Sequence, residues 1–320
     1  MIGTRWRVTF VGIAWRALVL LALPGVADLD GQVALSAPPP GKVSQVKPAL
    51  FSTPDKAMQA IVEAAKAKDR EALVNVFGPE ADRLFFGDRA QNSIDLEGLA
   101  AGLAEAAHLR KDGDSSYTLM VGKDQWPFPI PIVSQEGQWR FDTAAGIEEL
   151  LNRRIGDNEL SAVTTCRAYA VAQWEYFTDG DLDKDGVAEY AQKFVSSPGK
   201  HDGLYWETSE GEKTSPMGKL VAAARAGGAG DPYHGYYFKI LTRQGPHAPG
   251  GKYNYIINGN MIAGYALVAY PAQWGDSGVM TFIVNQQGRV YQRNLGLKTE
   301  QIARDMTVYD PNPSWRLVDP

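Results

Sequence analysis

Residues 279–294, VMTFIVNQQGRVYQRN, decide the fold class of the second half of the chain. Apolar and β-branched residues are frequent in 279–285 and 289–294, and Gln286-Gln287-Gly288 between them is typical of a tight hairpin turn. Two more strands are predicted upstream, at 235–241 and 265–270, and a helix at 215–225 precedes them. The sequence therefore predicts a helix followed by an antiparallel meander, an α+β arrangement.

The first half of the chain also predicts helices followed by strands. Helices are expected from Ser52-Thr53-Pro54-Asp55, where a capping hydroxyl and a proline mark a start, and then at 70–77 and 96–107. Strands are expected at 117–121, 129–133 and 139–142, with a turn at 135–137.

This order resembles the cystatin-like and ketosteroid-isomerase-type superfamily, in which helices pack across a curved sheet to form a cone. The resemblance covers roughly 51–142. It implies either a noncatalytic module or an enzyme with an Asp base in an apolar pocket. Neither Asp82 nor Asp88 lies in a motif that specifies such a base.

A long helical region should connect the two halves. Apolar residues recur at helical spacing around Leu150, and again from Leu160 to Phe177, with Gly156-Asp157-Asn158 between the two runs. Because Gly and Asn often end helices, we expect a break there and a domain boundary, giving domains 51–156 and 157–320. Trp174 and Phe177 are expected to pack in the core, and Cys166 is expected to be a buried, unreactive thiol.

The predicted helix leads into an acidic loop, Asp179–Tyr190, the one stretch whose composition specifies a chemistry. Asp181, Asp183 and Asp185 alternate ahead of Gly186, a spacing that turns several carboxylate oxygens towards one centre. Hard oxygen ligands favour Ca²⁺ over zinc or copper. The loop resembles the first half of an EF-hand or dockerin loop, but the twelfth position counted from Asp181 is Gln192, where an EF-hand has a bidentate Glu.

Two interpretations of this loop stay open. A plain solvated turn is one, because Asp and Gly are common in turns. A Ca²⁺ site is the other, and the repulsion between crowded carboxylates favours it. The predicted ligands are Asp181, Asp183, Asp185, Glu189 and Asp179, and the ion would act as a structural staple between a helix end and a sheet.

The N-terminus predicts export. Arg5, Arg7 and Arg16 precede an apolar run at 17–23, and Gly25-Val26-Ala27 offers small residues for cleavage. Residues 1–27 are therefore predicted to be a signal peptide and 28–50 a Pro-rich linker, which places the mature protein in the periplasm or outside the cell. The alternative is an uncleaved N-terminal membrane anchor, which would bring Arg16 near mid-membrane.

Composition limits the partners. The formal charge of -5 provides no basic footprint, so nucleic acid is not expected as a partner. One cysteine excludes an intramolecular disulfide, so the fold depends on its core. The many tyrosines after residue 233 are expected mainly in core packing and edge cover, with a glycan- or protein-binding face as the other use.

The segments 235–241, 266–271, 278–285 and 288–296 together resemble a family of exported bacterial envelope proteins known as domain of unknown function 2950. The similarity extends from about residue 51 to the C-terminus and implies no established activity. More remotely, the order helix, acidic loop, Tyr-rich strand and meander is similar to the globular heads of type II secretion pseudopilins, some of which hold calcium. The N-terminal pilin signature is missing here.

Enzyme motifs are weak. Gly275-Asp276-Ser277-Gly278 matches the start of the nucleophile motif of chymotrypsin-like proteases, and Ala106-Ala107-His108 is faintly similar to their histidine motif. Val279 replaces the second Gly, and His108 is expected in a helix. We therefore predict a noncatalytic binding or assembly module whose partner is an envelope protein or a glycan. The alternative is a hydrolase or isomerase that uses a pocket in the N-terminal domain.

Overall fold

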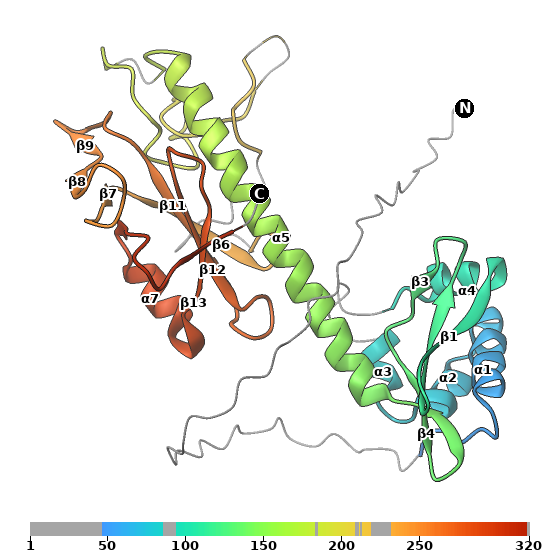
Figure 1. Ribbon diagram of the computed structural model, residues 1–320. Helices are drawn as coiled ribbons and strands as arrows, with labels where there is room; N and C mark the ends of the chain where they lie inside the picture. Colours follow the sequence, from blue (N-terminus) through green and yellow to red (C-terminus); the bar gives the residue numbers. More distant parts are fainter. Residues whose placement is uncertain are drawn as a thin grey trace. The chain divides into compact units, whose positions relative to one another are not determined.

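The computed structural model describes residues 47–318, except 86–93, 183–184, 209–210, 212 and 219–231. Its secondary structure is mixed α and β with antiparallel sheets, as the sequence predicts (Figure 1). Two separate clusters of buried apolar residues form the interior, one within 57–141 and the other within 162–315. The predicted signal peptide and most of the linker lie outside the described residues. No helix among the described ones is long and apolar enough to cross a membrane.

Four helices open the described chain. They are α1 Pro54–Ala67, α2 Arg70–Phe77, α3 Ala81–Phe85 and α4 Leu96–Glu105. The start of α1 is as predicted, since the Thr53 hydroxyl accepts a hydrogen bond from the Lys56 N–H (3.3 Å) with Pro54 at the first position. The bounds of α2 also agree with the prediction. Helix α4 ends two residues earlier than predicted, because Ala106 turns to an extended conformation.

The helices pack against a five-stranded sheet. Its strands are β1 Ala107–Gly113, β2 Ser116–Val121, β3 Trp126–Pro127, β4 Ile132–Gln135 and β5 Gln138–Phe141, in the order β1-β2-β4-β5, with β3 paired to β2. The hairpin between β4 and β5 has its turn at Glu136 and Gly137, as predicted. Strand β1 was not predicted, since its HLRKD core is polar and largely exposed. His108 therefore lies in a strand, which corrects the helix expected there.

Helix α5 runs without interruption from Thr143 to Thr178, so the predicted break at Gly156-Asp157-Asn158 is wrong. The helix tolerates Gly156, which faces open space, and Asn158 is buried because its amide donates to the Ser277 carbonyl (2.9 Å). Near the helix start, the Thr143 hydroxyl donates to the Phe77 carbonyl (2.7 Å). Asn158, which looks like a helix breaker in the sequence, thus makes a tertiary contact, and the domain boundary remains a prediction.

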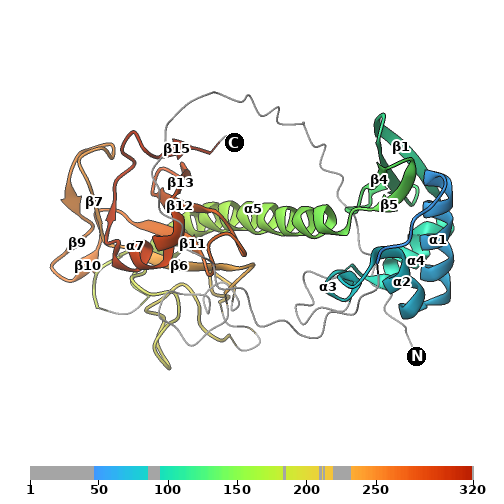
Figure 2. The same ribbon diagram turned by 90° about the horizontal axis from the view of Figure 1, so that it is seen from below.

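The second core surrounds an antiparallel sheet of strands β6 Tyr236–Leu241, β11 Ala266–Pro271, β12 Met280–Asn285, β13 Tyr291–Asn294 and β15 Arg316–Leu317, in the order β15-β13-β12-β11-β6. The first four are the predicted strands. Helix α5 packs along β11 and β12 (Figure 2), and α7, Thr299–Asp305, also packs on β11. Strand β11 is therefore buried along its whole length.

Smaller elements complete this half. Strands β7 Arg243–Gln244, β8 Tyr253–Asn254 and β14 Val308–Tyr309 form a three-stranded sheet; β9 Ile256–Ile257 pairs with β10 Asn260–Met261; and η1 is a turn of 3-10 helix at Gly296–Lys298. Residues 189–195 are irregular apart from a single bridge between Val195 and Tyr205. The helix expected at 215–225 falls largely on residues outside the described part, and 215–218 are not helical.

Candidate functional site

The acidic loop begins where α5 ends. Asp179 is the C-cap residue of the helix, and its carboxylate forms an ion pair with the Lys213 ammonium. Gly180 follows with a φ of 90°, a left-handed conformation that glycine adopts at no steric cost. The Asp179 carboxylate is thus already paired with a cation of the protein.

Asp181 and Asp185 shape the turn itself. The Asp181 carboxylate accepts hydrogen bonds from the Asp185 and Gly186 N–H groups, both at 2.9 Å. Asp185 accepts one bond from the Val187 N–H and another from the Asn260 amide, both at 2.9 Å. These contacts fold the loop back on itself and tie it to β10. Asp183 lies outside the described residues.

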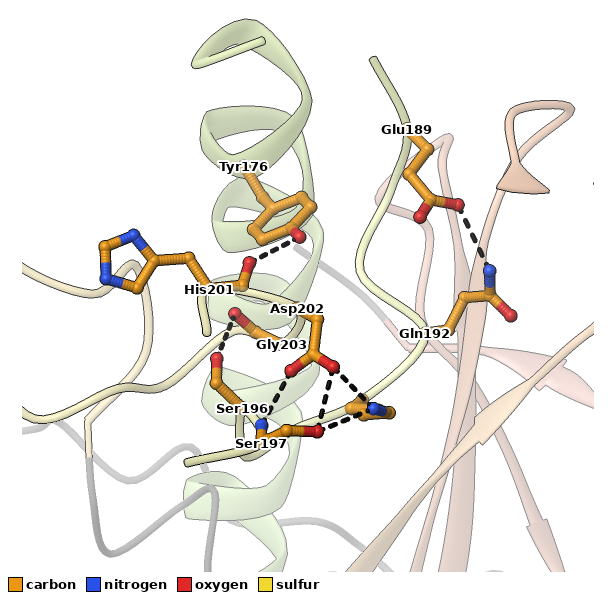
Figure 3. A network of polar contacts seen from close by, with 9 residues as sticks. Tyr176, Glu189, Gln192, Ser196, Ser197, His201, Asp202 and Gly203 are labelled. Carbon is orange, nitrogen blue, oxygen red and sulfur yellow. Dashed lines mark hydrogen bonds and ion pairs between the residues drawn. The ribbon is translucent and has the colours of Figure 1, made fainter. Parts of the chain in front are cut away.

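Glu189 is buried and belongs to the sheet side of the loop. Its carboxylate accepts hydrogen bonds from the Met261 N–H (2.5 Å) and from the Gln192 amide (3.1 Å), the second of which Figure 3 shows. The Tyr190 N–H donates to the Met261 carbonyl (2.8 Å), so 189–190 pairs with β10. Glu189 therefore fixes the end of the loop to a neighbouring strand.

The five predicted ligands are not brought to one centre by the described part of the chain. Among the described residues, no three His, Cys, Asp or Glu side chains lie close enough together to hold a metal ion. Asp179 and Glu189 have protein partners, while Asp181 and Asp185 share one turn. The calcium site remains a prediction.

Aromatic rings from the two ends of the acidic loop stack on one another. Phe177 from α5 stacks on Tyr190 (4.8 Å between ring centroids, 25° between planes), and Trp174 stacks on Phe177 (6.1 Å, 27°). Tyr190 in turn meets the buried Tyr265 edge-on (4.7 Å). The sequence assigned Trp174 to the core, which is wrong: 58% of its surface is exposed, and Phe177 is only half-buried.

The stack is anchored from below by Gln173. Its side chain is fully buried, accepts a bond from the Ala191 N–H (2.8 Å) and donates to the Ala191 carbonyl (2.8 Å) and to the Tyr169 hydroxyl (2.9 Å). Helix periodicity gave no signal for this residue, since a glutamine on the apolar face looks like an exception. The Gln173 amide pairs with the backbone of Ala191 as a neighbouring strand would. It thereby helps to position Tyr190, the residue before Ala191.

A second polar network lies just beyond the loop (Figure 3). Asp202 accepts bonds from the Lys193 ammonium (2.6 Å), the Ser197 N–H (2.6 Å) and the Ser197 hydroxyl (2.9 Å). Although burial opposes ionisation, these donors outweigh it and lower the pKa of Asp202 to about 2. Beside it the Tyr176 hydroxyl donates to the His201 carbonyl (2.7 Å), which ties the segment to α5.

The Gly275–Gly278 segment is a docking point for α5. Arg154 contacts Asp276 (2.5 Å), and the Glu159 carboxylate accepts bonds from the Val279 and Met280 N–H groups, both at 2.9 Å. The Ser277 hydroxyl donates to the Gln273 carbonyl (3.2 Å), and His108 belongs to the other sheet. The described residues thus use this motif as a structural turn.

Cys166 and Tyr265 are withdrawn from solvent. Cys166 is buried as predicted, and burial raises the pKa of its thiol. Burial likewise raises the pKa of Tyr265 to about 12. The described tyrosines from residue 233 onward are all buried or half-buried. The fully buried tyrosines of this half are Tyr169, Tyr176, Tyr236, Tyr255, Tyr270 and Tyr309.

The chain is a mixed α+β protein with antiparallel sheets, and its acidic loop is bonded to a neighbouring strand through Glu189. Residues 48–318 match the family described as "Protein of unknown function (DUF2950)", and the chain belongs to that family. The resemblance inferred from the strand segments is therefore confirmed. No curated protein and no solved structure matches the chain. The cystatin-like cone and the pseudopilin-like head remain predictions.

Proposed function

We propose that this protein is an exported, noncatalytic binding or assembly module of the cell envelope. The observation that carries the proposal is the packed interior of the N-terminal half. Phe77 lies against Phe85, Phe128 and Phe141 at 4.8 to 6.2 Å between ring centroids. Among the described residues of 51–142, no carboxylate is buried.

An isomerase or hydrolase of the kind considered above needs a pocket with a carboxylate whose environment tunes its pKa. In this half a core of buried apolar side chains, mostly aliphatic with four phenylalanines, lies between the helices and the sheet. In the C-terminal half, the buried carboxylate Glu189 is engaged by the backbone of β10. Both observations favour a role in which the surface, and not an interior pocket, meets the partner.

The binding role is tested with the full chain as bait. The mature protein, immobilised through its C-terminus, is incubated with envelope extract and with an array of cell-wall glycans, and bound material is identified by mass spectrometry. We expect saturable, reproducible retention of one partner. Turnover of a substrate by the purified protein, abolished by a single substitution, would contradict the noncatalytic role.

We also propose that the acidic loop binds Ca²⁺ through Asp181, Asp183 and Asp185, with Asp179 and Glu189 holding the loop in place. The support is the curled turn, in which Asp181 accepts bonds from the Asp185 and Gly186 N–H groups, and the left-handed conformation of Gly186, at a φ of 93°. Crowded carboxylates repel each other unless a cation intervenes. Sites of about 10⁻⁴ to 10⁻³ M are sufficient outside cells.

Calorimetry tests the calcium site. We expect Ca²⁺ to bind the wild type and to raise its melting temperature relative to chelator, because a ligand that binds only the folded state stabilises it. Asp183→Asn should weaken binding strongly, and Glu175→Gln, an exposed acid on α5, should not. Equal melting temperatures in calcium and in chelator, together with no binding heat, would refute the site.

A further inference from the structure

The exposed end of the aromatic stack has the properties of a binding surface. Trp174 forms the outer ring, and Phe177 and Tyr190 lie behind it. We call these three residues the aromatic platform. Exposed tryptophan is costly to leave in water, and Trp and Tyr are enriched where proteins meet partners. Val171, one turn earlier on α5, is also 58% exposed and widens the apolar surface.

Hydrogen bonds hold the segments behind the aromatic platform, which distinguishes it from a chance exposed side chain. Gln173 and Ala191 exchange two hydrogen bonds of 2.8 Å behind it. The Tyr265 hydroxyl donates to the Ala170 carbonyl (2.9 Å), holding the ring under Tyr190 in place. A partner that docks here meets Tyr190 on a segment already held by hydrogen bonds, so ordering that segment costs little conformational entropy on binding.

The surroundings of the aromatic platform are electronegative. It lies at the C-terminal end of a 36-residue helix, where the helix dipole places partial negative charge. Glu175, Asp181 and Asp185 are exposed nearby along the chain. The Lys213 ammonium is engaged by Asp179, and Arg167 lies two turns before Trp174 on α5. The face of an indole ring attracts cations through its quadrupole. The Trp174 ring and the nearby carboxylates therefore both favour a positively charged ligand.

We propose that the aromatic platform, together with Asp181 and Asp185, receives a basic segment of a partner protein, with an Arg or Lys side chain lying over Trp174 and neighbouring cations facing the two carboxylates. The inference rests on the binding role proposed above and specifies the chemistry of the partner. Charge complementarity at an interface chiefly raises the association rate and selects the partner, while the buried aromatic contact supplies affinity.

The test uses the full mature chain and a fluorescently labelled peptide in which Arg alternates with Gly, followed by anisotropy. We expect Trp174→Ala to weaken binding about tenfold, within the range of a partly desolvated cation–π contact, and Asp181→Asn with Asp185→Asn to slow association. Leu160→Ala is the matched control, because Leu160 is 56% exposed on the same helix but lies away from the aromatic platform. Binding should weaken as salt is raised.

Two further measurements separate the possible outcomes. A peptide with Glu in place of Arg should not bind, and Ca²⁺ should weaken binding of the basic peptide if it occupies the loop. Equal affinity of Trp174→Ala and wild type would overturn the inference, as would an equal loss in Leu160→Ala. If the wild-type bait retains its envelope partner and Trp174→Ala retains it equally, the binding role stands and only the basic ligand is wrong. Unchanged melting of Trp174→Ala shows that the variant folds.

Discussion

The two cores of this protein differ in their aromatic side chains: both contain phenylalanine, but among the described residues only the second contains buried tyrosines. The N-terminal core is centred on phenylalanines, with Phe77 touching three other rings. The C-terminal core is centred on tyrosines, several of which donate to a backbone carbonyl: Tyr169 to Ala266, Tyr176 to His201, Tyr236 to Met280 and Tyr265 to Ala170. Phenylalanine contributes by burial alone, which has no direction. A buried tyrosine hydroxyl needs a partner in one place, so it also fixes where a loop or helix lies.

The difference follows the architecture. In the N-terminal half, helices and a regular sheet satisfy their own backbone groups, and only apolar volume has to be filled between them. In the C-terminal half, the described residues of 179–206 are irregular apart from a single bridge between Val195 and Tyr205. Two carbonyls of this segment, those of Ala191 and His201, accept hydrogen bonds from the Gln173 amide and the Tyr176 hydroxyl. We therefore expect the two halves to respond differently to substitution.

The largest effect is expected in the phenylalanine core. Phe77→Ala removes a ring that is 1% exposed, and the cavity left among three other rings should lower the free energy of unfolding by about 3 to 5 kcal/mol. Urea denaturation measures this loss of unfolding free energy. Phe77→Leu, which retains most of the volume, should recover much of the loss, and Trp126→Ala, at a 39% exposed ring in the same half, should cost far less. Similar losses in all three variants would contradict the cavity explanation.

A smaller loss of stability is expected in the tyrosine core when a single hydrogen bond is removed. Tyr236→Phe leaves the ring in place but removes the hydrogen bond to the Met280 carbonyl (2.8 Å), so we expect a loss of about 1 kcal/mol. Tyr237→Phe, at the half-buried neighbour on β6, is the control. The additional readout is amide exchange at 278–280, which should accelerate in Tyr236→Phe because the bond holds that segment. Faster exchange throughout the sheet instead would show that the hydroxyl serves global stability only.

The sequence predicted regular elements well where one physical signal dominated. Thr53-Pro54 sets the start of α1, and alternation with a Gly turn sets β12 and β13. It failed where a tertiary contact outweighed local preference. Gly156 and Asn158 look like a helix end, but the bond from Asn158 to Ser277 and the docking of Glu159 on Met280 keep α5 continuous. Trp174 looked like core because helical spacing identifies a face without saying whether anything covers it. The family assignment rested on several strands at once and was correct.

The smallest expected effect is a pH dependence of stability that Asp202, in the polar network of the C-terminal half, should show and the exposed Asp82 of the other half should not. The folded-state pKa of Asp202, about 2, is below its ordinary value of 3.8, so its contribution to stability is present above pH 3.8 and is lost as the pH falls through 2. The difference in unfolding free energy between wild type and Asp202→Asn should therefore be constant near neutral pH and narrow between about pH 4 and about pH 2. Urea titrations across that range measure it. Asp82→Asn is the comparison, since the ion pair of Asp82 with Arg70 is more than half exposed on both sides and should contribute little at any pH. A flat profile for Asp202→Asn would mean that Lys193 and Ser197 hold the segment without depending on the charge of Asp202.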